Sequence, residues 1–181
     1  MIYYSIPYNS NKNIGVYYNN FMSILPNDND WACFLDGDAV FTTTNFGNQL
    51  EDIISKYLDA GVFVGVTNRI GCTWQKVDII DDTINTMDYH REIGKIIQNK
   101  YYDLCEDVTF KDDNLLSGVL FLIKKEVWKK IGGFKETGML AIDNDLHLKC
   151  RNNNIKVYKM EGVYVYHWYR NNNRKNIEHL I

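Results

Sequence analysis

Two aspartates one residue apart, Asp36 and Asp38, have the spacing in this sequence that most directly suggests chemistry. They follow the apolar run 31–35, and Gly37 between them permits a tight turn that directs both carboxylates into the space beyond a strand. Paired carboxylates suit a hard divalent cation, which can neutralise a diphosphate leaving group. The alternative is an ordinary turn after a strand, because the polar segment 28–30 repeats the pattern.

Asp143 and Asp145 form a second pair of acids, at the expected start of a helix over 142–151. Residues two apart on a helix point in different directions. One carboxylate can therefore face a cleft as a general base while the other caps or supports the helix. The alternative is the general preference for negative charge at a helix N-terminus.

These acids need a scaffold, and the hydrophobic pattern predicts strands separated by helices. The order indicates a single α/β domain over 1–181, a Rossmann-like α/β/α sandwich with a mixed, largely parallel sheet. Such sheets bind ligands at the carboxyl ends of their strands, where Asp36 and Asp38 fall. We expect strands at 2–6, 31–35, 62–66, 119–123, 155–158 and 163–166, and helices at 13–25, 44–60, 86–101, 125–131 and 142–151.

Bulk composition narrows the class of protein. The formal charge of −3 over 181 residues provides no basic field, so nucleic-acid binding is not expected. The four cysteines show no Cys-x-x-Cys spacing, and no apolar run approaches the length of a membrane span. We therefore expect a reduced, cytoplasmic protein without a transmembrane segment. The sequence leaves the oligomeric state open.

Four segments in order resemble family 2 glycosyltransferases of the GT-A fold. The longest runs from Gly118 to Glu136 and contains Gly-Gly-Phe-Lys-Glu, similar to the Gly-Gly-Phe-Asp-Glu of that family. Ile-Asp-Asn-Asp-Leu at 142–146 is similar to its Glu-Asp-x-Asp-Leu. Phe-Leu-Asp-Gly-Asp at 34–38 resembles its metal motif, and the strand 163–167 ends in histidine as in the family. The resemblance covers nearly the whole chain after about residue 13, and the helix at 13–20 is part of it.

The resemblance implies a role for each matching residue. Asp38 would bind Mn²⁺ or Mg²⁺, and Asp36 would lie near the ribose or sugar of the donor. Asp143 would be the general base that deprotonates an acceptor hydroxyl, and His167 would complete the metal or diphosphate site. The implied reaction moves a sugar, with inversion, from a nucleotide-diphosphate donor such as a UDP-sugar to a glycan or other hydroxyl acceptor.

The amino-terminal region departs from the family pattern. The strand and helix that usually intervene before the metal motif are missing, and with them the aspartate that contacts the base. Pro7, Tyr8 and Asn9 would then form the nucleotide wall, with Tyr8 stacking on the base. In addition, Ile142 replaces the first acid of the Glu-Asp pair.

Further candidates follow the other strands. Arg69 could pair with a donor phosphate, and Trp74 could offer a stacking face in the acceptor site. Trp128 and Asp145 are further acceptor-site candidates. Packing or surface roles are the alternative for each of these residues. The tail at 168–170 could cover the diphosphate or simply pack.

Two rival functions fit part of the pattern. In a haloacid-dehalogenase-like phosphatase, Asp36 would attack phosphorus and Asp38 would act as acid and base. That reading leaves the segment 132–136 unexplained and lacks a convincing lysine motif. The other rival is a nucleotide-sugar-binding protein that keeps the fold without turnover.

Overall fold

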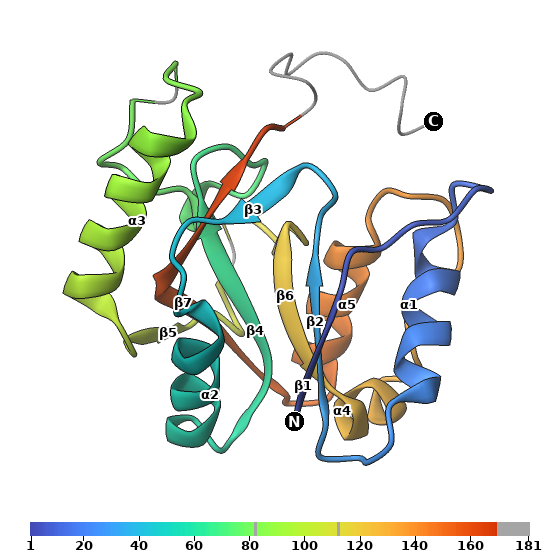
Figure 1. Cartoon of the computed structure of the whole chain (residues 1–181). Helices are drawn as coiled ribbons and strands as arrows, with labels where there is room; N and C mark the ends of the chain where they lie inside the picture. Colours follow the sequence, from blue (N-terminus) through green and yellow to red (C-terminus); the bar gives the residue numbers. More distant parts are fainter. Residues whose placement is uncertain (82, 112, 170–181) are drawn as a thin grey trace.

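The computed structural model describes residues 1–81, 83–111 and 113–169 as a three-layer α/β/α domain (Figure 1). The strands are β1 (Ile2–Ser5), β2 (Trp31–Leu35), β3 (Ala39–Phe41), β4 (Ala60–Thr67), β5 (Cys105–Asp107), β6 (Leu120–Lys124) and β7 (Lys156–His167). The α-helices are α1 (Ile14–Ile24), α2 (Phe46–Lys56), α3 (Met87–Tyr101), α4 (Lys125–Lys130) and α5 (Ile142–Asn152), and a 3₁₀ turn η1 spans Thr73–Gln75.

The strands form one sheet in the order β1-β2-β6-β4-β7-β3, with β5 also paired to β7. The neighbours β1 and β2 are parallel, as are β4 and β7. Between them β6 runs antiparallel to both β2 and β4. The predicted α/β class and mixed sheet are therefore confirmed. Four of the seven described strands share one direction, and β3, β5 and β6 oppose them.

Alternating strand residues supply the two faces of the sheet. Ala32 and Phe34 of β2 pack in the core beneath α1 and α5, whereas Trp31 and Cys33 face the α2 side. A smaller cluster joins α3 to the ends of β4 and β7. Helices thus cover both faces, and in Figure 1 α1, α4 and α5 lie on the opposite side from α2 and α3.

The predicted strands at 155–158 and 163–166 prove to be one continuous strand, β7. The prediction left residues 159–162 between two strands, but the strand continues through all four. A Cβ on Gly162 would lie 2.4 Å from the carbonyl oxygen of Tyr101, so glycine here admits the end of α3 against the strand. The short strands β3 and β5 were not predicted. Within the described residues, no helix combines the length and apolarity needed to cross a bilayer.

Candidate functional site

The carboxyl ends of β2, β4 and β7 meet the start of β6 at one edge of the sheet, as the parallel-sheet rule predicts. The loop after β2 is fixed there by its backbone. The Asp36 N–H donates to the carbonyl of Val119 (2.9 Å), and the carbonyl of Asp38 accepts from the N–H of Trp168 (2.9 Å). The Ala39 N–H donates to the Asp36 carbonyl (3.0 Å), closing the turn around Gly37.

His167 is brought to this loop by the pairing of β3 with β7, in which it lies opposite Ala39. The imidazole is buried, and its Nδ1 lies 2.7 Å from the carbonyl oxygen of Arg69. Because a carbonyl only accepts, we assign the proton of the neutral ring to Nδ1. Nε2, with its lone pair, then faces Oδ1 of Asp38 at 3.2 Å. Nε2 and Oδ1 would then both be acceptors and would repel each other, unless a cation lies between them or the ring gains a second proton.

Asp36, Asp38 and His167 each place one ligand atom within 4.8 Å of the others. Carboxylate oxygens and an imidazole nitrogen are ligands that Mn²⁺ accepts readily, and the carboxylates also suit Mg²⁺. Burial raises the pKa of Asp36 to about 7; a positive charge on His167 would oppose this shift, and the charges of Asp38 and Asp143 add to it. The donor set, with its opposed lone pairs, therefore fits a divalent cation.

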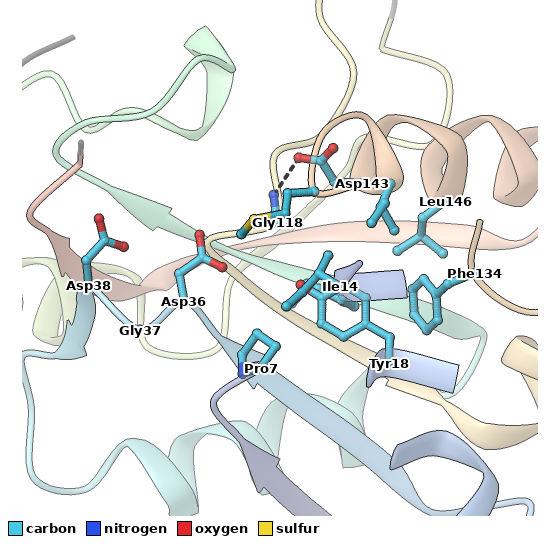
Figure 2. Close-up of a pocket in the computed structure, with 13 residues that line it drawn as sticks. Pro7, Ile14, Tyr18, Asp36, Gly37, Asp38, Gly118, Phe134, Asp143 and Leu146 are labelled. Atoms are coloured by element: carbon cyan, nitrogen blue, oxygen red, sulfur yellow. Dashed lines mark hydrogen bonds between the residues drawn. The ribbon is translucent and has the colours of Figure 1, made fainter. Parts of the chain in front are cut away.

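Asp143 lies near the start of α5, on the other wall of the same region (Figure 2). Its Oδ2 accepts from the backbone N–H of Gly118 (3.0 Å), and its Oδ1 from that of Asn144 (2.9 Å). Burial raises the pKa of Asp143, although these hydrogen bonds oppose the shift. Ala141, which precedes the helix, has a left-handed backbone (φ 63°) that non-glycine residues seldom adopt. Asp143 is thus held in one orientation.

Two adjoining cavities share Asp36, Asp38 and Asp143 on their walls. The first has a volume of about 380 Å³ and an apolar side formed by residues such as Tyr18, Phe134 and Leu146. Figure 2 shows these side chains grouped away from the carboxylates of Asp36 and Asp38. The second, of about 250 Å³, is lined on its far side by Ile70, Ser117, Leu140, His167 and Tyr169.

The predicted nucleotide wall is only partly present. Pro7 lines the first cavity, close to Asp36 in Figure 2. Tyr8 is 75% exposed and lines neither cavity. The Asn9 side chain accepts hydrogen bonds from the backbone of Asn11 and Asn13, which stabilises the turn before α1. The structure therefore brings Pro7 to the site, but not Tyr8 or Asn9.

Arg69 and Trp74 also lie away from the carboxylates. Arg69 is 3% exposed, its side chain hydrogen-bonds Tyr166, and its backbone carbonyl oxygen contacts Nδ1 of His167. Trp74 is buried, donates from Nε1 to the carbonyl of Asn114 (2.9 Å), and borders a different cavity. Neither side chain lines the two acid-bearing cavities.

The two remaining acceptor-site candidates have structural contacts. Trp128 donates from Nε1 to the side chain of Asn19 (2.8 Å) and packs against the core beneath α1. Asp145 forms an ion pair with Lys149 one turn along α5, with Nζ 2.9 Å from Oδ2. Of the pair on α5, Asp143 faces the cavities and Asp145 does not. Of the tail at 168–170, Tyr169 lines the second cavity and residue 170 lies outside the described residues.

Sequence reasoning missed several residues of the site. Tyr18, which lines the first cavity, lies in a helix whose pattern indicates only packing, and Met139, which lines both, lies in a loop without a recognisable pattern. Gly118 carries a signal in retrospect, since it opens the segment of resemblance and its N–H orients Asp143. No protein-family model matches the chain, and no curated protein matches it in sequence. A functional assignment therefore depends on the site itself.

Proposed function

We propose that this protein is a metal-dependent glycosyltransferase that transfers a sugar from a nucleotide-diphosphate donor to a hydroxyl acceptor. The proposal is carried by the convergence of three possible metal ligands, Asp36, Asp38 and His167, beside two adjoining cavities. Asp143 lies across from them and lines both cavities. Among the described residues that line these cavities there is no lysine or arginine. A diphosphate bound here would need a cation to balance its charge.

Asp36, Asp38 and His167 would hold Mn²⁺ or Mg²⁺. The ion would supply positive charge against the developing diphosphate. The resemblance to family 2 glycosyltransferases of the GT-A fold, in which the matching residues serve this purpose, supports the same assignment. Pro7 and the apolar side of the first cavity offer a surface for the donor.

Asp143 would act as the general base. Its carboxylate would accept the proton of the acceptor hydroxyl while the acceptor oxygen bonds to the anomeric carbon. The bond from that carbon to the diphosphate oxygen breaks, and its electron pair leaves with the diphosphate. A raised pKa makes Asp143 a stronger base than an exposed aspartate. Its position on the wall common to both cavities would let a donor in one meet an acceptor in the other.

The test is a calorimetric and thermal-shift screen of UDP, GDP, CMP and their sugar conjugates, each with Mn²⁺, with Mg²⁺ and with a chelator. We expect metal-dependent binding of one diphosphate nucleotide, slow metal-dependent hydrolysis of its sugar conjugate, and loss of both in Asp38→Ala. Asp28→Ala is the matched control, because Asp28 lies in a similar Asp-Asn-Asp turn and pairs with Lys129 at the surface.

Other outcomes would select the rivals. Magnesium-dependent release of phosphate from simple esters, without a response to any nucleotide, would replace the proposal with the phosphatase. Tight nucleotide-sugar binding without hydrolysis or transfer to any acceptor would indicate a binding protein.

A further inference from the structure

A third cavity, of about 480 Å³, lies apart from the proposed active site and shares no lining residue with the other two cavities. It is enclosed by the second half of α3, by the segment 73–79 that contains η1, and by the middle of β7. Its volume falls in the range of small-molecule sites, roughly 300–1,000 Å³. The proposed glycosyl transfer does not use it.

The inner wall of this cavity is apolar. Val66 and Ile97 form part of a buried cluster under α3, and the indole of Trp74 belongs to the main core. At the surface, Ile79 and Ile96 also line the cavity, yet they remain 56% and 53% exposed. Isoleucines that stay exposed beside an apolar cavity mark a place where a ligand would bury further apolar surface.

Lysines provide the charge around this wall. Four line the cavity, Lys76, Lys100, Lys111 and Lys159. The described lining also contains two acids, Asp78 and Glu161, and Glu106 pairs with two of the lysines from outside the lining. Among the described residues that line the cavity, four lysines thus accompany two acids, in a chain whose formal net charge is −3.

The acids are not shared equally among the lysines. Lys159 is buried and pairs with Glu106 (2.6 Å) and Glu161 (2.9 Å), and Lys111 also pairs with Glu106 (2.7 Å). Neither Lys76 nor Lys100 has an acidic partner within the described residues, and Lys100 lies over the ring of Tyr101. These two ammonium groups are therefore available to an anion.

We infer that this cavity binds a small amphiphilic anion, with an apolar body against Trp74 and Ile97 and a carboxylate or phosphate group at Lys76 and Lys100. An alkyl or acyl chain suits the wall because it needs no hydrogen bonds. The headgroup suits the two lysines because an ammonium binds either anion as a point charge. A neutral apolar molecule would make no ionic contact with these two lysines.

The experiment measures binding of octanoate and octyl phosphate by calorimetry, below their micelle-forming concentrations, with octanol and inorganic phosphate as comparisons. We expect saturable binding of at least one amphiphilic anion, and much weaker binding of octanol and of inorganic phosphate. A preference between the two anions identifies the headgroup. Because Trp74 lines the cavity, its fluorescence should change with the same concentration dependence, and Trp74→Phe should remove that change.

The double variant Lys76→Gln/Lys100→Gln should weaken binding of the anion by roughly tenfold or more. Lys95→Gln is the matched control, because Lys95 lies on the same helix, pairs with Glu92 and does not line the cavity. Equal binding of octanol and the anions, equal losses in the two lysine variants, or no saturable binding of any probe would each overturn the inference. These results do not depend on metal or nucleotide, so they are independent of the proposed transfer.

Discussion

Nε2 of His167 lies 3.2 Å from Oδ1 of Asp38, while Nδ1 of the same ring is engaged by the carbonyl oxygen of Arg69. The backbone of His167 is held as firmly, because its N–H and its carbonyl both bond to the side chain of Asn68 (2.8 and 3.2 Å). The ring can therefore offer Nε2 to a cation without reorganisation. Asp38 is the more exposed partner and Asp36 the half-buried one.

The first prediction concerns the metal. Mn²⁺ should raise the melting temperature of the wild type, because it binds the folded state and relieves repulsion between Asp36 and Asp38. Asp38→Asn and His167→Gln should each weaken Mn²⁺ binding by at least tenfold, measured by the paramagnetic resonance of free Mn²⁺. The Asp28→Asn control should bind as the wild type does. Equal affinity in all four proteins would mean that Mn²⁺ binds elsewhere.

The second prediction separates the two acids of α5. Asp143→Asn should lower the transfer rate by roughly 10²–10⁴-fold, since the amide cannot accept the proton of the acceptor. Metal-dependent nucleotide binding should persist. Asp145→Asn removes only a partly exposed ion pair with Lys149 and should leave the rate within a few-fold of wild type. Radiolabelled donor transfer checks both variants, and equal rates for Asp143→Asn and wild type would remove Asp143 from its role.

The third prediction concerns acid sensitivity through His147, which is buried on α5. Its Nδ1 accepts from the N–H of Leu116 (3.1 Å), and its Nε2 lies 3.2 Å from the carbonyl of Val108. This arrangement accommodates only the neutral ring, and burial together with the charge of Arg151 lowers its pKa. Its contribution to stability is therefore fully present above the ordinary pKa of about 6.5 and is lost as pH falls through the lowered folded value.

His147→Gln tests this dependence, because glutamine cannot gain a proton. Wild type should lose stability relative to this variant as the pH falls below about 6.5, measured as the free energy of unfolding in urea. A constant difference between the two proteins from neutral to acidic pH would show that His147 does not titrate on unfolding.

The fourth prediction compares two glycines at the second position of a helix. A Cβ at Gly15 of α1 would lie 1.9 Å from the carbonyl oxygen of Lys135, whereas one at Gly47 of α2 would meet only Tyr4, at 3.7 Å. Gly15→Ala should therefore destabilise the fold by about 1–3 kcal/mol through overpacking. Gly47→Ala should be neutral or slightly stabilising, because alanine favours helix. Equal effects in thermal unfolding would contradict the close contact at Gly15.

The predictable parts of the fold are those with a strong local signal. The strands at 31–35 and 62–66 were predicted from continuous apolar runs, and helices such as 86–101 from their spacing of apolar residues. The continuity of β7 depends on its contact with α3 at Gly162, which no local pattern reveals. The antiparallel insertion of β6 is likewise set by tertiary pairing.

The site divides in the same way. The sequence predicts three acids of the site from their local positions: Asp36 and Asp38 follow a strand, and Asp143 lies at the start of a helix. The approach of His167 to Asp38 depends on β3, whose three residues are too short to predict from sequence. The side chains of Arg69 and Trp74 turn away because each has its own hydrogen-bond partner, Tyr166 and the carbonyl of Asn114. Position along the chain cannot reveal such partners.

The central place of β6 also bears on how the chain reaches its fold. In the described sheet, β6 lies between β2 and β4 and pairs with both, and it follows both of them and the helices α2 and α3 in the chain. Until β6 arrives, the β1–β2 pair and β4 have no strand between them to complete the sheet. Contacts between distant parts of a chain slow folding. The decisive folding step should therefore be a late one, in which β6 joins the β1–β2 pair to β4.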